Sequence, residues 1–116
     1  MCSSDLSLIG ASLDGKVALI FDDMISTAGT VVSAANTAIK VGKAKLVYVF
    51  GTHGVLCGEA IARLKPAPIE KLIITDTIPL TPEKQLAKIE VLTVGELLAD
   101  AIKRIHFNQS VSELFV

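Results

Sequence analysis

The sequence predicts an α/β domain built on a parallel β-sheet, and three observations support this fold class. The 116-residue chain is 51% hydrophobic and 20% charged, so it can fill a core and is not expected to be disordered. Aromatic residues are only 4% of it, so the core must come from aliphatic side chains, the usual filling between helices and a parallel sheet. Apolar runs of strand length alternate with helical patterns, as in consecutive βαβ units.

The first predicted unit is a strand, a loop and a helix. The strand is expected over residues 16–21, where an apolar run follows an Asp-Gly turn signal at 14–15. The run ends at the acidic pair at 22–23. The helix is expected to begin after Thr30, a suitable N-cap residue, and to end at Gly42, which stands where a C-terminal capping glycine belongs.

Three more strands and two more helices complete the pattern. The strands are expected over 46–50, 72–75 and 89–92. A short helix over 59–64 is stopped by two prolines, and an amphipathic helix is expected over 95–105. The alternation predicts a parallel sheet with right-handed crossovers.

Polar residues follow three of these strands, in segments 22–30, 52–53 and 75–77. In open α/β sheets, ligands bind beyond the carboxyl ends of the strands. We therefore expect these three segments to lie together and to form a binding site.

The segment 22–30 has the residues of a phosphate-binding loop. It ends in Thr-Ala-Gly-Thr at the start of a helix, where backbone N–H groups and the helix N-terminus form a cradle for an anion. Ala28 and Gly29 allow close approach of the backbone, and Thr27 and Thr30 add hydroxyl donors. The loop therefore favours a phosphate group as ligand.

The acidic pair Asp22 and Asp23 needs a different partner, because carboxylates repel phosphate. They can accept hydrogen bonds from sugar hydroxyls, or help to order a Mg²⁺ ion bound to a polyphosphate. A phosphate at one end and vicinal hydroxyls at the other describe ribose 5-phosphate. Two alternatives stay open: an acidic pair that only caps the helix, and a receiver domain with Asp76 as phospho-acceptor.

Composition disfavours several other classes of protein. A net charge of −1 gives no surface for a polyanion, so no nucleic-acid partner is expected. No stretch is long enough to span a bilayer, and no signal-peptide pattern is present, so we expect a cytoplasmic protein without a membrane partner. Cys2 and Cys57 match no disulfide framework and no metal-ligand spacing, and are expected to be free thiols.

Several motifs together resemble one family. The segment 20–30 resembles the PRPP loop of type I phosphoribosyltransferase folds, and the Thr-Asp-Thr-Ile-Pro motif at 75–79 narrows the resemblance. From about Leu8 to its end, the chain resembles the C-terminal part of the ribose-phosphate pyrophosphokinases, or PRPP synthetases. The other motifs in order are Gly-Lys-Val-Ala at 15–18, Thr-His-Gly-Val at 52–55, Ala-Ile-Lys-Arg-Ile-His at 101–106 and Ser-Val-Ser-Glu-Leu-Phe at 110–115.

The resemblance implies a fold, a reaction and a set of residues. It implies a partial, parallel-sheet phosphoribosyltransferase-type domain from an enzyme that transfers the diphosphoryl group of ATP to ribose 5-phosphate with Mg²⁺. It implies a hexameric homo-oligomer, with Ser110 and Ser112 at a regulatory site for ADP and phosphate between subunits. The implied ribose 5-phosphate-binding residues are Asp22, Asp23, Ser26, Thr27, Ala28, Gly29 and Thr30.

The chain also departs from the family. Ser26 stands where the family usually has aspartate, and Gly10-Ala11 where it usually has Gly-Asp. The family's ATP-binding residues, its histidine and aspartate metal ligands and its Lys/Arg loop lie upstream of the matched segment. No catalytic residue and no metal ligand is therefore assigned to this chain, and we expect it to be inactive alone.

Residues 1–6 carry an expectation of their own. Met-Cys-Ser-Ser-Asp-Leu matches the translation of a common sequencing-adapter end read from a GTG start, which predicts a non-native leader on a truncated gene. Residues 7–116 are then an incomplete C-terminal phosphoribosyltransferase-like domain, with an apolar interface exposed where the rest is missing. The alternative is a genuine short protein.

Two further functions remain as alternatives: a non-catalytic subunit of a mixed synthetase oligomer, and a stand-alone phosphoribosyltransferase, for which no base-binding hood is visible.

Single residues carry smaller expectations. His53 is expected to be structural or to form a hydrogen bond in a loop, and Cys57 to be small and buried. Asp76 is expected either to contact a ligand or to stabilise its own loop. Lys103-Arg104 is expected to be a solvated helix end, and His106 to be structural.

Overall fold

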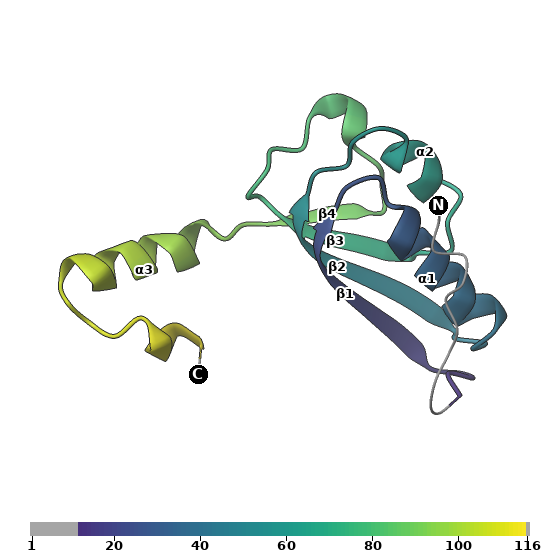
Figure 1. The fold of residues 1–116 in the computed structure, drawn as a ribbon, viewed down its shortest axis with the longest axis horizontal. Coiled ribbons are helices and arrows are strands. Elements are labelled where there is room, and N and C mark those ends of the chain that lie inside the picture. Colours follow the sequence, from purple (N-terminus) through teal and green to yellow (C-terminus); the bar gives the residue numbers. More distant parts are fainter. Residues whose placement is uncertain (1–11, 116) are drawn as a thin grey trace.

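The computed structural model describes residues 12–115 as a four-stranded parallel sheet in the order β1-β2-β3-β4 (Figure 1). Two helices cover one side of the sheet, and the third projects away from it at the carboxyl ends of the strands. The predicted leader at 1–6 and the Gly-Ala departure at 10–11 lie outside the described residues. The elements are β1 Val17–Ile25, α1 Gly29–Lys40, β2 Leu46–Gly54, α2 Ala60–Leu64, β3 Lys71–Thr75, a 3₁₀ turn at Pro82–Lys84, β4 Ile89–Leu92, α3 Gly95–His106 and a 3₁₀ turn at Ser112–Phe115.

The core lies between the sheet and helices α1 and α2. Alternate residues of β2 and β3 face it, while the helices contribute small residues that let them sit close to the sheet. The prediction of an aliphatic core is confirmed for the described residues. Its buried members are Ile25, Ala28, Val31, Ala35, Ala38, Ala44, Val47, Val49, Leu56, Ala60, Leu64, Ile69, Leu72 and Ile74.

Two strands run further than the apolar runs predicted. β1 continues through the acidic pair to Ile25, and β2 continues to Gly54, the residue with which Ile25 pairs. The glycines of β2 make this possible. A Cβ atom at Gly54 would lie 2.5 Å from Cδ1 of Ile74, and one at Gly51 would overlap the side chain of Ile25. Because Gly51 and Gly54 have no side chains, Ile25 and Ile74 pack directly on the backbone of β2. The strand pairing therefore continues where strand propensity is low.

Helix α1 begins earlier than predicted but ends where it was expected to end. Ala28, not Thr30, is the N-cap residue, and its backbone is left-handed with φ 68°. The prediction of Thr30 as N-cap was wrong because the loop turns into the helix two residues earlier. At the other end, the Gly42 N–H donates to the Thr37 carbonyl at 3.0 Å, as expected of a residue just past the cap. The remaining strands and helices match their predicted positions to within one residue.

The other face of the sheet is open to solvent. Along β1, Val17, Leu19 and Phe21 expose 48%, 54% and 71% of their surface, and Phe21 stacks on Phe50 with ring centroids 4.9 Å apart. The outer edge of β1 pairs with no strand of the described chain. The apolar face of α3 is also exposed, with Ile102 at 67%. The molecule therefore presents a large uncovered apolar surface, as expected for an incomplete domain.

Candidate functional site

The carboxyl ends of the strands bring the three predicted polar segments together. Met24 of β1 pairs with His53 of β2. The Nδ1 atom of His53 lies 2.8 Å from the hydroxyl of Thr77, which follows β3. The Thr75 hydroxyl donates to the Thr52 carbonyl at 2.5 Å. His53 lies within β2 rather than in the loop after it, and its ring joins the segment that follows β3, so the segments form one polar edge.

A small cavity of about 60 Å³ opens in the loop between β1 and α1. Six of the seven predicted ribose 5-phosphate residues line it, and the exception is Asp23, an exposed residue whose N–H donates to the Asp22 carboxylate at 2.8 Å. The cavity therefore coincides with the loop that the sequence indicates. Its lining residues are Asp22, Met24, Ile25, Ser26, Thr27, Ala28, Gly29, Thr30 and Val31.

The first turn of α1 offers free donors to this cavity. The first backbone bond of the helix runs from the Val32 N–H to the Ala28 carbonyl at 3.0 Å. The N–H groups of Gly29, Thr30 and Val31 donate to no acceptor within the described part of the chain. Such N–H groups at the positive end of a helix dipole attract an anion.

The back of the loop is fixed by the segment that leads into α2. The Cys57 N–H donates to the Ser26 carbonyl at 2.9 Å, and Nη1 of Arg63 donates to the Thr27 carbonyl at 3.1 Å. A Cβ atom on Gly29 would lie 3.5 Å from the same Nη1. Arg63 was missed from the sequence, since one arginine in a short helix gives no local signal of a contact 36 residues away.

Cys57 is exposed, so the prediction that it is buried was wrong. It lies in the turn between β2 and α2, where its backbone supports the loop and its side chain is directed to solvent. Its thiol is free, as predicted.

A second cavity, of about 170 Å³, is lined by residues of all four strands. Asp22 lines both cavities and is the residue that they share. The second cavity is bordered by the aromatic pair Phe21 and Phe50 and by the polar residues Thr52 and Thr75. A ligand with its phosphate in the loop can therefore extend past Asp22 toward the polar edge of the sheet.

Asp76 joins β3 to the start of α3. Its carboxylate accepts a hydrogen bond from the Val94 N–H at 2.9 Å. That donor, together with the Thr93 hydroxyl, holds the pKa of Asp76 below its ordinary value. Of the two roles left open for Asp76, the geometry favours stabilising the loop.

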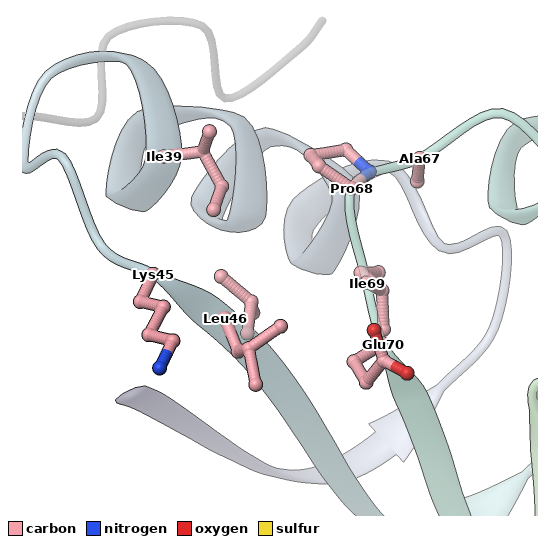
Figure 2. Close-up of a pocket in the computed structure, with 8 residues that line it drawn as sticks. Ile39, Lys45, Leu46, Ala67, Pro68, Ile69 and Glu70 are labelled. Atoms are coloured by element: carbon pink, nitrogen blue, oxygen red, sulfur yellow. The ribbon is translucent and has the colours of Figure 1, made fainter. Parts of the chain in front are cut away.

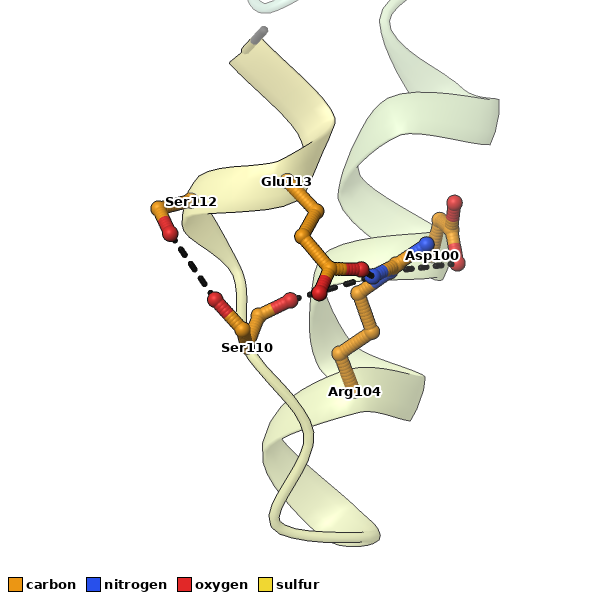
Figure 3. Close-up of polar contacts among 5 residues, drawn as sticks. All are labelled: Asp100, Arg104, Ser110, Ser112 and Glu113. Atoms are coloured by element: carbon orange, nitrogen blue, oxygen red, sulfur yellow. Dashed lines mark hydrogen bonds and ion pairs between the residues drawn. The ribbon is translucent and has the colours of Figure 1, made fainter.

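The C-terminal segment is held by Arg104 (Figure 3). Its Nη1 donates to the Glu113 carboxylate at 2.9 Å and to the Ser110 carbonyl at 3.1 Å, and its Nε lies 3.5 Å from Asp100. The hydrogen bond that Arg104 donates to Glu113, and the charges of the Asp100 and Glu113 carboxylates, raise the pKa of Arg104. The expectation of a solvated helix end was therefore wrong for Arg104, because the tail folds back on α3.

The two predicted regulatory serines lie together in this segment. The hydroxyls of Ser110 and Ser112 are 2.8 Å apart. Both follow α3, which projects away from the sheet (Figure 1), so they are not part of the phosphate loop. His106, at the end of α3, packs edge-on against Phe107 with ring centroids 4.9 Å apart.

A cavity of about 240 Å³ lies at the opposite end of the strands (Figure 2). It is formed at the amino ends of β2 and β3, with Lys45 and Glu70 on its rim. Ligands of open α/β sheets bind at the carboxyl ends, so this cavity is not assigned to the site.

Among residues 12–115, no group of three or more His, Cys, Asp or Glu side chains is arranged to hold a metal ion. No helix in the same range has the length and apolar character needed to cross a membrane.

Comparison with known proteins identifies one family. The phosphoribosyl synthetase-associated domain matches residues 4–116. The ribose-phosphate pyrophosphokinase of Rhodopirellula baltica is 56% identical over 109 residues, which are 94% of this chain and 34% of that protein. The enzyme of the same name from Caldanaerobacter subterraneus is 50% identical over 110 residues, again 34% of its length.

The fold has a solved counterpart. A crystal structure of phosphoribosylpyrophosphate synthetase from Mycobacterium smegmatis matches with a TM-score of 0.80 and 35% identity, over 85% of this chain and 33% of that chain. The predicted α/β fold with a parallel sheet is thereby confirmed. The chain spans about one third of the length of the relatives it matches.

Proposed function

Because this chain belongs to the phosphoribosyl synthetase-associated domain family, we propose that residues 22–30 bind ribose 5-phosphate within a protein that makes PRPP from it and ATP. One observation carries the proposal. Gly29, Thr30 and Val31, whose N–H groups have no acceptor in the described chain, line a small cavity that Asp22 also lines. Hydrogen-bond donors for a phosphate thus lie beside an acceptor for sugar hydroxyls, which is what a sugar phosphate requires.

The 5-phosphate occupies the cavity of the loop in this proposal. The N–H groups of Gly29, Thr30 and Val31 donate to its oxygens, and the hydroxyls of Thr27 and Thr30 add further donors. The positive end of the α1 dipole favours the charge of the ligand. Ser26 also lines the cavity and contributes a hydroxyl where the family usually has a carboxylate.

The ribose ring lies toward the second cavity. Asp22, which borders both cavities, accepts hydrogen bonds from the sugar hydroxyls. Asp23 is exposed beside it and contacts the sugar from the solvent side. Mg²⁺ is usually held by one or two carboxylates together with substrate phosphates, so Asp22 and Asp23 could help to order an ion bound to a polyphosphate.

Replacing Asp22 by asparagine separates sugar recognition from phosphate recognition. We expect Asp22→Asn to weaken ribose 5-phosphate binding by about tenfold or more, because hydrogen bonds to a charged acceptor are lost. Inorganic phosphate is expected to bind equally well or better, since a nearby negative charge is removed. Isothermal titration with both ligands measures this, and Asp14→Asn, an exposed change before β1, is the matched control. Equal losses for both ligands would count against a sugar-binding Asp22.

We further propose that residues 7–116 correspond to the C-terminal third of a synthetase. The uncovered face of the sheet, where Phe21 is 71% exposed, is then a surface on which the rest of the protein packs. Ser110 and Ser112, positioned by Arg104, belong to a regulatory site for ADP and phosphate in a hexamer of the whole enzyme.

The purified chain is expected to make no PRPP by itself. Phosphoryl transfer depends on positioned cations and metal around ATP. The described residues that line the two cavities at the carboxyl ends include no lysine or arginine. An assay with Mg-ATP and ribose 5-phosphate checks this, with a complete relative as positive control. Synthesis of PRPP by the chain alone would contradict the proposal that catalysis needs residues from another part of a complete synthetase.

A second candidate is a non-catalytic subunit of a mixed synthetase oligomer. The exposed apolar face of β1 and β2 favours it, because that face suits a protein partner as well as another part of the same chain. Recovery of a stable complex when the chain is produced with a complete synthetase from the same source would support this candidate.

A further inference from the structure

The direction of the peptide groups in the phosphate loop decides what it can bind. A trans peptide directs its C=O and N–H to opposite sides. The described chain has no cis peptide bond. Whatever fixes a carbonyl on one side of the loop therefore directs the next residue's N–H to the other side.

Two successive carbonyls of the loop are fixed on the side of α2. The Ser26 carbonyl accepts from the Cys57 N–H at 2.9 Å, and the Thr27 carbonyl accepts from Arg63 at 3.1 Å. Neither Cys57 nor Arg63 lines the phosphate cavity. The N–H groups of Thr27 and Ala28, whose residues do line it, are consequently directed away from α2 and toward the cavity.

The Thr27–Ala28 peptide is the one that depends on a side chain. Cys57 holds its partner through the backbone, so the identity of its side chain is irrelevant to that bond. The Thr27 carbonyl, in contrast, is held in the described chain only by the Arg63 guanidinium. Ala28 next to it has a left-handed backbone, which is costly for a residue with a side chain. A strained peptide therefore depends on one guanidinium.

We propose that Arg63 is a positioning residue of the ribose 5-phosphate site. It holds the Thr27 carbonyl toward α2, so that the Ala28 N–H faces the phosphate and no carbonyl oxygen does. Rotation of this peptide would replace a donor by an acceptor in the cavity, and an acceptor repels phosphate. The inference rests on the proposed function of the loop.

The matched position beside it makes a clean control. Arg63 and Lys65 are both exposed basic residues at the end of α2, and two residues of helix separate them by about 200° around the axis. The Lys65 side chain forms no hydrogen bond or ion pair within the described part of the chain. Lys65→Met thus removes a charge from the same helix without touching the loop.

The test is titration of the full chain and its variants with ribose 5-phosphate, at low and at high salt. Arg63→Met is expected to weaken binding by about tenfold at both salt concentrations, Arg63→Lys by less, and Lys65→Met not at all. In the Arg63→Met variant the Ala28 amide resonance is expected to lose its ligand-induced shift, while amides of the buried residues Leu64 and Leu72 keep their positions.

Three outcomes distinguish the possibilities. A loss of affinity that disappears at high salt means that Arg63 acts only as a surface charge, and overturns the proposal. Unchanged affinity in Arg63→Met also overturns it, and leaves the proposed function intact. If the unmodified chain binds no ribose 5-phosphate, the proposed function itself has failed.

Discussion

The Ala28→Val variant is expected to bind ribose 5-phosphate about 100-fold more weakly than the unmodified chain, the largest effect on binding that the structure predicts. Ala28 is the N-cap residue of α1, is 4% exposed and has φ 68°. A β-branched side chain is strongly disfavoured at positive φ, and the two extra methyl groups must enter a packed region. The loop is therefore expected to leave the conformation that forms the cavity.

Ala28→Gly is the matched control for this prediction. Glycine adopts positive φ without steric cost, so the loop is expected to keep its conformation and its affinity for ribose 5-phosphate. Titration calorimetry on both variants makes the comparison, and circular dichroism reports whether the domain remains folded. Wild-type affinity in Ala28→Val would mean that the left-handed backbone at this residue is not needed for binding.

Gly54→Ala is expected to lower the free energy of unfolding by about 1–3 kcal/mol, which is the largest predicted effect on stability from a single methyl group. The new Cβ would lie 2.5 Å from Cδ1, 3.1 Å from Cγ2 and 3.3 Å from Cβ of Ile74. The last two atoms are tied to the backbone of β3 and cannot move aside as a side-chain end can. Ile74 is 1% exposed, so the surrounding core has no space to receive it.

Two further variants test this explanation by urea unfolding. Gly51→Ala is expected to lower the free energy of unfolding by less than Gly54→Ala does. Its new methyl group would overlap only the outer atoms of Ile25, whose Cβ would be 3.9 Å away. Ile74→Val alone is expected to cost about 0.5–1.5 kcal/mol. Combined with Gly54→Ala it should cost less than the sum of the two, because Cδ1 is gone. Additive costs would show that the clash with Ile74 is not the cause.

Much of the fold could be predicted because its information is local. Strands β3 and β4 and helix α3 were placed to within one residue, since each is a continuous apolar run or a clear helical period between breakers. The ends of β1 and β2 could not be placed, because they depend on pairing across the sheet. Gly51 and Gly54 look like strand terminators in sequence and act in the structure as points of close packing.

The residues of the candidate site also fall into those that the sequence could predict and those that it could not. Six of the seven predicted loop residues line one cavity, because a phosphate loop is a contiguous segment with a recognisable composition. Asp23 is the exception, set outside the cavity as an exposed residue at the end of β1. Arg63 and Arg104 could not be assigned from the sequence, because their partners lie 36 and 9 residues away and are brought near only by the turns after β2 and α3.

The uncovered apolar surface bears on how the protein works in the cell. Val17, Leu19 and Phe21 lie along an edge strand, which is a surface that folded proteins seldom leave open. A partner, or another part of a longer chain, that covers it would complete the sheet at the strand that leads into the phosphate loop. Binding of ribose 5-phosphate and assembly are therefore expected to be coupled through β1.

The most direct test of the central claim is titration of the isotopically labelled chain with ribose 5-phosphate, followed through its backbone amide resonances. We expect saturable shifts at Gly29, Thr30 and Val31, with none at Lys45 or Glu70 beside the cavity at the amino ends of the strands. Shifts confined to that opposite cavity, or no saturable shift in the loop, would contradict a ribose 5-phosphate site at residues 22–30.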